Sequence, residues 1–282
     1  MKIAISCEST CDLSPEILKE YDIHTIPYTV LLGETQGKDG EITPEQIFEY
    51  VDQTGILPKT AAVNEFEYEE YMDLLLKEYD AVIHISLSGE LSSSCSHLRE
   101  LASKVKNVYV IDSRTFSTGI GLLAIYAKKL ADSGLNCEEI VKKVEERIPY
   151  VQASFVLNTL DYLVKGGRCS ALKAFGANLL KLKPRIVVKN GTMSHNKQYR
   201  GKNNVVIEQY CADTLKDFNN PDLSVAFLTN TTASPEMVEV AIEALQKRGF
   251  KKIYHTVAGS TITSHCGPKC LGILYINDGG KD

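Results

Sequence analysis

Residues 81–112 read AVIHISLSGELSSSCSHLRELASKVKNVYVID, which is two apolar runs on either side of a serine-rich turn and an amphipathic segment. The apolar runs, Ala81–Leu87 and Val108–Asp112, have the length and β-branched content of buried strands. Ser92–Lys104 between them is long enough for a helix. Parallel neighbouring strands need such a crossover, so this stretch predicts a strand–helix–strand unit of an α/β fold.

The same alternation continues on both sides of this unit. We expect further strands at Lys2–Ser6 and Ile23–Leu31, and helices from Pro44 to about Gln53, from Asn64 to about Tyr79 and over Thr118–Ser133. Thr43 with Gln46, and Asn64 with Glu67, have the spacing of capping boxes, which mark helix starts. The pattern favours a largely parallel sheet covered by helices on both faces.

The second half of the chain has a different pattern of expected strands, turns and helices. After a polar helix that starts at Asn136, we expect a Lys-rich turn at Lys181–Pro184 and a hairpin at Asn190-Gly191. Strands are expected at Gln152–Asn158, Ser224–Thr229, Lys252–Val257 and Leu271–Ile276, and helices at Val205–Phe218 and Pro235–Lys247. At 282 residues two domains are the natural expectation. We place the boundary near residue 150, giving α/β domains at 1–150 and 151–282.

Composition limits the class of function. Hydrophobic residues make up 44% and charged residues 24%, and the net charge is −5, which argues against general nucleic-acid binding. The opening residues, MKIAISCEST, lack the long apolar segment of a secretory signal, and no run approaches the ~20 apolar residues of a spanning helix. We therefore expect a cytoplasmic protein whose eight cysteines are reduced.

Polar clusters follow several of the expected strands. They are Ser9–Asp12, Thr60, Ser86–Ser93 and Asp112–Ser117. In an open α/β sheet, ligands bind beyond the carboxyl ends of the strands, where helix N-termini attract anions. Each cluster alone is also explained by helix capping, but four at the strand ends of one sheet favour a ligand site.

Two motifs of the second half complete the candidate site. In Gly166-Gly167-Arg168 the glycines let the backbone approach a ligand, and Arg168 is a forked donor for a carboxylate or phosphate. His265 lies in Ser264–Pro268, which we interpret as a Gly/Pro loop. The other five histidines have no comparable context, and we interpret them as structural.

Other chemistry has weaker support. Cys7 with Cys11, and Cys266 with Cys270, are spaced as zinc ligands can be, but no further pair completes a ligand set, so we expect no metal. Phosphate-binding and dinucleotide-binding loops are absent from the sequence, and the segment around Ser88 lacks the glycine before the serine of a nucleophile elbow. A catalytic triad built from Ser92, His265 and an Asp stays open.

Taken together, these segments resemble the DegV family, which includes the fatty-acid-binding subunits of bacterial fatty acid kinase. The resemblance runs nearly end to end. It is carried by Ser9–Leu13, Pro58-Lys59-Thr60, Leu91-Ser92, Val110–Ser113, Ser117–Gly121, Leu160–Arg168, Lys183-Pro184, Tyr199–Lys202 and His265–Pro268. Ala61 and Cys266 stand where the family usually has hydroxyl residues, and Glu8 where it usually has Asp.

The resemblance implies two α/β domains with an acyl chain between them. Thr60, Ser92 and His265 would bind the head group, with Arg168 nearby, and Arg200 would face the partner. The ligand would be a long-chain fatty acid such as palmitate, stearate or oleate, without a further cofactor. A separate kinase would then phosphorylate the presented carboxylate, and transient membrane contact would serve lipid exchange.

Two alternatives remain at this stage. One is a hydrolase-type enzyme that uses Ser92 and His265. The other is a carrier of another anionic lipid. The sequence leaves open which acid is preferred, which kinase is the partner and which oligomer forms.

Overall fold

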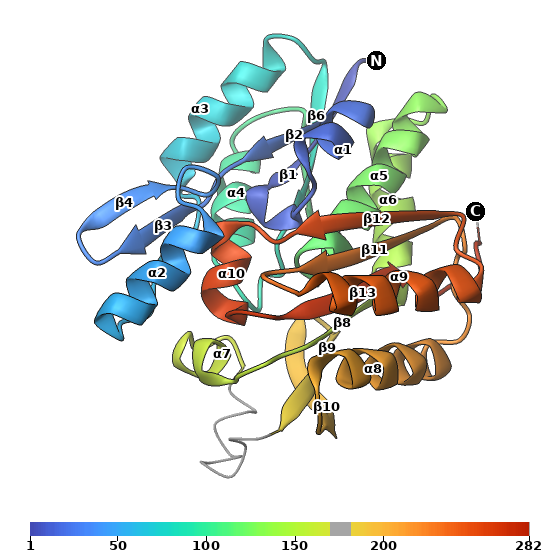
Figure 1. Ribbon diagram of the computed structural model, residues 1–282. Coiled ribbons are helices and arrows are strands. Elements are labelled where there is room, and N and C mark those ends of the chain that lie inside the picture. The colour runs from blue at the N-terminus through green and yellow to red at the C-terminus, as the bar shows by residue number, and fades with distance from the viewer. Residues whose placement is uncertain (170–181, 282) are drawn as a thin grey trace.

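A four-stranded parallel sheet forms the centre of the first half. The computed structural model describes residues 1–169 and 182–281. The strands of this sheet lie in the order β2 (Ile23–Ile26), β1 (Ile3–Glu8), β6 (Ala81–Ser86), β7 (Val108–Asp112). All three neighbouring pairs are parallel, and Figure 1 labels β1, β2 and β6 of this sheet. The predicted α/β class and parallel sheet are confirmed.

Two helices of the first half, α2 and α3, begin where the capping signals placed them. Both predicted capping boxes form, at Thr43 with Gln46 and at Asn64 with Glu67. The helices are α1 (Pro15–Glu20), α2 (Pro44–Thr54), α3 (Glu65–Leu76), α4 (Ser94–Ala102), α5 (Thr118–Asp132) and α6 (Cys137–Arg147).

The expectation of one strand over Ile23–Leu31 is wrong. The chain forms β2 and then β3 (Thr29–Leu32), which belong to different sheets. Pro27 stands between them, and its missing N–H cannot continue a ladder. β3 pairs on both sides with antiparallel strands, β4 (Thr35–Lys38) and β5 (Lys59–Ala61). Thr60 therefore lies in this small sheet and not at a strand end of the parallel sheet, which corrects the expectation that it does.

The second half contains a mixed six-stranded sheet. Its order is β10 (Thr192–Tyr199), β9 (Lys183–Lys189), β8 (Val151–Val156), β13 (Leu271–Ile276), β11 (Val225–Asn230), β12 (Lys252–Val257). The hairpin at Asn190-Gly191 is confirmed as the β9–β10 turn. Of the expected turn at Lys181–Pro184, Lys181 lies outside the described residues, whereas Lys183 and Pro184 begin β9. α8 (Asn203–Asp217) and α9 (Pro235–Arg248) pack on one face of this sheet.

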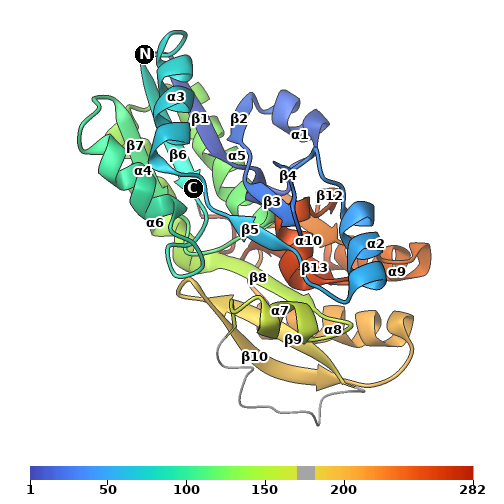
Figure 2. The same cartoon turned by 90° about the vertical axis from the view of Figure 1, so that its left-hand side faces the viewer.

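The main core joins the two halves. α5 contacts β1 and β6 of the parallel sheet as well as β8 and β13 of the mixed sheet. One cluster of buried apolar side chains accordingly runs from Ile5 and Ile83 to Phe155 and Leu274. Figure 2 shows the mixed sheet curving beneath the first half. The boundary near residue 150 therefore stays a prediction: the sheets change between β7 and β8, but the buried side chains of both halves pack together.

A short helix from the second half, α10 (Ser260–Cys266), lies against elements of the first half. Its first backbone N–H groups are bound by two carboxylates from far earlier in the chain. Asp12 accepts from Gly259 N at 2.8 Å, and Asp39 accepts from Ser260 N at 2.7 Å and Thr261 N at 3.3 Å. Carboxylates at a helix N-terminus satisfy donors that the helix itself cannot.

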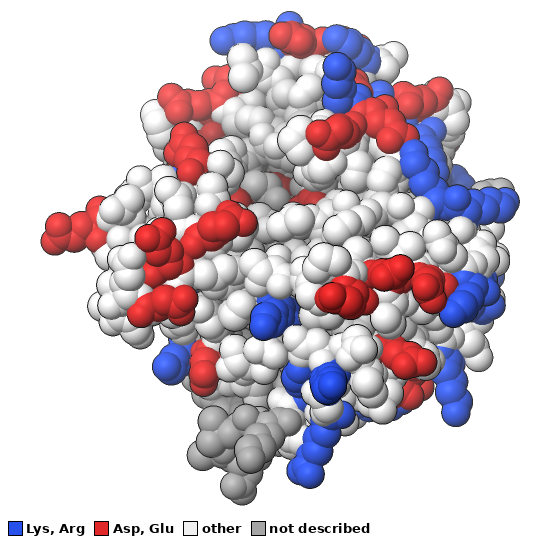
Figure 3. Space-filling view, in the orientation of Figure 1, with Lys and Arg blue, Asp and Glu red and all other residues white. Residues whose placement is uncertain are grey.

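Charge is unevenly distributed on the face shown in Figure 3. Acidic side chains gather over α2 and the β3–β4 hairpin, while Lys and Arg lie mainly along the right edge and the foot of the view. No helix in the described part of the chain has the length and apolar character that crossing a membrane requires.

Replacing Asp39 should destabilise the protein. Asp39→Ala removes the acceptor of two α10 N–H groups and of the Ser9 hydroxyl, so we expect a loss of about 1–2 kcal/mol in the free energy of unfolding. Asp73→Ala, at an exposed position of α3, is the matched control and should change stability by less than about 0.5 kcal/mol. Urea unfolding measures both; equal stability of the two variants would contradict the capping role.

Candidate functional site

A cavity of about 480 Å³ lies where α10 meets the small sheet and the loops after β6 and α7. α7 spans Asp161–Lys165. Its wall contains Thr60, Ser92, Arg168 and His265, which the resemblance places at or near a head group, so we call this space the head cavity. The structure thus brings together the four residues that the sequence selected.

A second cavity, of about 340 Å³, adjoins the first. The two share Phe116, Ile262 and Cys266 in their walls. We call the second space the tail cavity because Phe155, Leu274 and other apolar side chains line much of it. Ala62, Leu87 and Leu91 also make one side of the head cavity apolar.

The polar residues of the tail cavity are engaged within the protein. The Thr229 hydroxyl is 2.8 Å from that of Thr118 and 3.0 Å from that of Thr256. Ser154 Oγ lies 3.1 Å from the Tyr210 hydroxyl. Because these hydroxyls are already hydrogen-bonded within the protein, a ligand meets mainly the carbon atoms of their side chains. This cavity therefore suits an apolar group.

Thr60 and His265 meet although 205 residues separate them in the sequence. Thr60 Oγ1 lies 2.9 Å from His265 Nε2, and both side chains are half-buried. The expectation that His265 sits in a loop is wrong, because it is in the last turn of α10. Gly267 and Pro268 suggested a loop, but Gly267 is the C-cap of this helix, and Gly259 is its N-cap.

Burial keeps His265 neutral. Removal from water first, and the positive charge of Arg168 second, lower the pKa of His265 to about 4. At neutral pH the ring therefore has one N–H donor and one unprotonated nitrogen.

Ser92 is bonded to a residue that sequence reasoning missed. Its hydroxyl lies 2.8 Å from the hydroxyl of Tyr28, which is buried in the wall of the head cavity. Tyr28 follows Pro27 in the short link between β2 and β3, and nothing in the local sequence marks it as a neighbour of Ser92. With Tyr28 as the partner of Ser92 and Thr60 as the partner of His265, these contacts do not pair a serine nucleophile with a histidine base.

Arg168 lies at the exposed side of the head cavity. It donates to the Gly166 carbonyl at 2.9 Å and approaches the Leu91 carbonyl at 3.4 Å. Gly166 is needed beside it, since a Cβ there would lie 2.6 Å from His265 Nδ1. The glycine loop thus places a guanidinium next to a buried imidazole.

The two positions at which a hydroxyl residue was expected from the resemblance, 61 and 266, fall in different places. Ala61 is exposed, and its neighbour Ala62 is the residue in the cavity wall. A hydroxyl at position 61 would therefore not belong to the wall as described. Cys266 does line both cavities.

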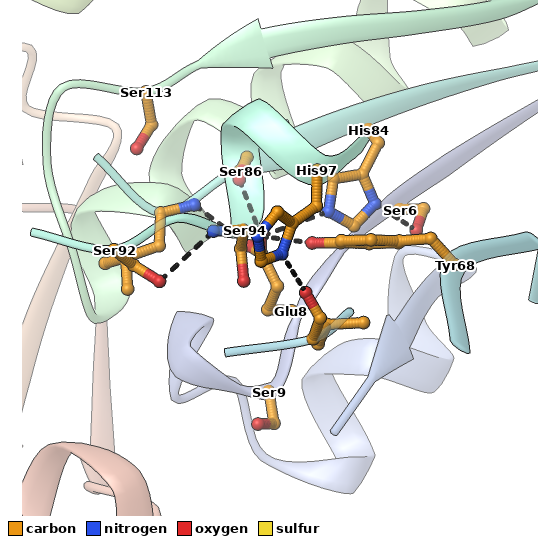
Figure 4. A network of polar contacts seen from close by, with 12 residues as sticks. Ser6, Glu8, Ser9, Tyr68, His84, Ser86, Ser92, Ser94, His97 and Ser113 are labelled. Atoms are coloured by element: carbon orange, nitrogen blue, oxygen red, sulfur yellow. Dashed lines mark hydrogen bonds and ion pairs between the residues drawn. The ribbon is translucent and has the colours of Figure 1, made fainter. Parts of the chain in front are cut away.

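A buried carboxylate fixes the loop that carries Ser92. Glu8 accepts from Ser86 Oγ at 2.6 Å, Tyr68 Oη at 2.7 Å and Leu87 N at 2.9 Å. Figure 4 shows these side chains beside the segment with Ser92 and Ser94. Burial alone would raise the pKa of Glu8, but His84 at 3.5 Å and the hydroxyl donors lower it below its ordinary value. An ionised Glu8 thus holds the backbone at Leu87, which leads into the head cavity.

The remaining candidate residues are Arg200, which was expected to face a partner, and the four cysteines that have the spacing of zinc ligands. Arg200 is exposed just beyond the end of β10. The cysteines at 7, 11, 266 and 270 are all buried. Within residues 1–169 and 182–281 no group of three or more His, Cys, Asp or Glu is placed to hold a metal ion.

Known proteins are similar to this chain along nearly its full length. The DegV family model matches residues 2–278. A DegV domain-containing protein of Clostridium perfringens is 31% identical over 98% of this chain and 99% of its own. A protein of Thermotoga maritima named fatty acid-binding protein is 30% identical over 96% of each chain.

Solved structures agree with this match. A DegV family protein from Thermus thermophilus, described by its fatty acid binding, has a TM-score of 0.89 at 25% identity and covers 98% of this chain and 100% of its own. DegV from Bacillus subtilis, described as a fatty acid binding protein, has a TM-score of 0.85 at 27% identity, with 99% and 100% covered.

The fold and the site define an α/β protein with two adjoining cavities beside α10. With the family model and the relatives matching nearly end to end, the chain belongs to the DegV family.

The pKa of His265 predicts a pH effect on stability. The folded protein holds this pKa near 4, whereas an unfolded histidine has a pKa of about 6.5, so between these values the unfolded chain binds more protons. Lowering the pH from 6.5 to 5 should therefore reduce the free energy of unfolding by about 1–2 kcal/mol more in the parent than in His265→Gln. Urea titrations at both pH values measure this difference, and identical pH dependence of the two proteins would contradict it.

Proposed function

We propose that this protein binds one long-chain fatty acid and presents its carboxylate to a separate kinase, which forms the acyl phosphate. The observation that carries the proposal is the adjoining pair of cavities, one with convergent polar groups and one suited to an apolar chain. Relatives that are described as fatty acid-binding proteins support it.

The acyl chain would provide the binding energy. A sixteen-carbon acid has roughly 14 methylenes, and at ~0.8 kcal/mol each their transfer from water contributes ~11 kcal/mol before the cost of association. The two cavities adjoin at Phe116, Ile262 and Cys266, and the acyl chain would pass there from the head cavity into the tail cavity.

The head cavity would stabilise the carboxylate. A bare carboxylate out of water is strongly disfavoured, so it needs donors. The hydroxyls of Thr60 and Ser92 and the single N–H of neutral His265 would supply them. Arg168 would add positive charge from the exposed side, where the carboxylate has to meet the kinase.

None of these residues has to act as a nucleophile in this scheme. The kinase would supply the nucleotide and metal, and this chain would supply an oriented acyl group. Docking of the kinase would involve Arg200, which is exposed, and lipid exchange would involve brief contact with a membrane.

Protein purified from a bacterial host should contain about one fatty acid per chain. Burial of the tail makes the complex stable through purification. Solvent extraction of the denatured protein followed by mass spectrometry identifies the acid and its amount. The proposal would be contradicted if the purified protein contained no lipid and also took up neither palmitate nor oleate.

Ser92→Ala provides a check on the orientation of the ligand. Loss of this donor should weaken palmitate binding by on the order of 1–3 kcal/mol, since the carboxylate loses a buried partner. Ser96→Ala, on the exposed side of α4, is the matched control and should bind as the parent does.

Arg200→Ala and Arg168→Ala should affect the kinase reaction differently. A charge at the rim of an interface mainly changes the association rate, so Arg200→Ala should keep the lipid but lower turnover most at low salt. Arg168→Ala should impair phosphorylation at any salt, because its charge acts beside the carboxylate. Turnover by a cognate kinase across ionic strength, at equal lipid loading, separates the two. Loss of lipid from the Arg200 variant, or normal turnover at every salt concentration, would remove Arg200 from the interface.

A further inference from the structure

Helix α10 has four hydroxyl side chains within Ser260–Ser264, and three of them are bonded to backbone carbonyls. Ser260 donates to Ile42, Thr263 to Ala258 and Ser264 to Ser260. The exception is Thr261. It is 3% exposed, and its Oγ1 has no partner among the described residues.

Local structure explains why Thr261 differs from its neighbours. A threonine in a helix ordinarily bonds the carbonyl three or four residues before it. For Thr261 these residues are Val257 and Ala258, which precede α10, and the Ala258 carbonyl already accepts from Thr263. The hydrogen bonds from the N–H groups of Ser260 and Thr261 to Asp39 oppose a shift of the backbone towards another acceptor.

The position of Thr261 in the cavity wall indicates a function for its hydroxyl. Thr261 is part of the head-cavity wall, together with Thr60, Ser92 and His265. Thr60 and Ser92 have partners within the protein, in His265 and Tyr28, and must share or exchange them to bind a ligand. Thr261 exchanges no protein hydrogen bond when it binds an acceptor, and it gains the partner that a buried hydroxyl normally has.

We propose that Thr261 is a further head-group residue, whose hydroxyl donates a hydrogen bond to the carboxylate of the bound acid. This inference rests on the proposed function. It predicts that the hydroxyl lowers the stability of the free protein, in which it has no partner. In the complex the same hydroxyl strengthens binding, because it donates to the carboxylate.

The test compares Thr261→Val with the parent, after both have been delipidated. Valine keeps the shape and removes the hydroxyl, so the melting temperature of the free protein should stay equal or rise, because an unpartnered buried polar group is lost. Palmitate should bind about three- to tenfold more weakly, as expected for one lost hydrogen bond. Hexadecan-1-ol, which has no carboxylate, should lose less affinity than palmitate.

Thr263→Val is the matched control on the same helix. Its hydroxyl is bonded to Ala258 and is not part of the cavity wall, so this variant should melt at a lower temperature and bind palmitate as the parent does. Thr261→Ser keeps a hydroxyl and should retain most of the affinity. If Thr261→Val does not fold, Thr261→Ala compared with Thr261→Ser gives the same contrast.

The outcomes separate the two proposals. A parent that binds palmitate and a Thr261→Val variant that binds it equally well would overturn the role of Thr261 alone. A parent that takes up no palmitate would overturn the proposed function, and the role of Thr261 with it. Opposite shifts in melting temperature and affinity, found in Thr261→Val but not in Thr263→Val, would support both.

Discussion

The N-terminus of α10, held by two carboxylates from the first half of the chain, is the constraint on which the site depends. Asp39 binds the N–H groups of Ser260 and Thr261, and Asp12 binds that of Gly259. Burial raises the pKa of Asp12 well above its usual range, against the hydrogen bonds from Ser117 and Gly259 that lower it. Burial thus disfavours the ionised form of Asp12, whereas the hydrogen bonds that connect it to Ser117 and to the start of α10 favour that form.

Glu8 plays the corresponding part on the other side of the head cavity. Asp12 and Asp39 fix the helix that carries His265, and Glu8 fixes the backbone that leads to Ser92. Three carboxylates that do not line the cavity therefore define where its polar groups stand. A site whose polar groups are held in advance loses less conformational freedom when a ligand binds.

The parts of this structure that the sequence predicted are those with local causes. The parallel strands follow from apolar runs and crossover helices, and the helix starts from capping boxes such as Asn64 with Glu67. α10 was missed because its cap comes from Asp39, 221 residues before Ser260, so its own segment looks like a glycine loop. Thr60, Ser92, Arg168 and His265 were recognisable only through their motifs, whereas Tyr28 and Thr261 have no local signal, since what distinguishes each is a tertiary neighbour or the lack of one.

The pairing of Thr60 with His265 across 205 residues also has a consequence for how the protein is made. During translation the small sheet with Thr60 leaves the ribosome early, and the parallel sheet can form next. The helix with His265 follows every strand of the parallel sheet and of the small sheet in the chain, so it emerges after all of them. The head cavity therefore has no complete wall until α10 has been made, so a nascent chain that stops before α10 lacks the side of the cavity that His265 provides.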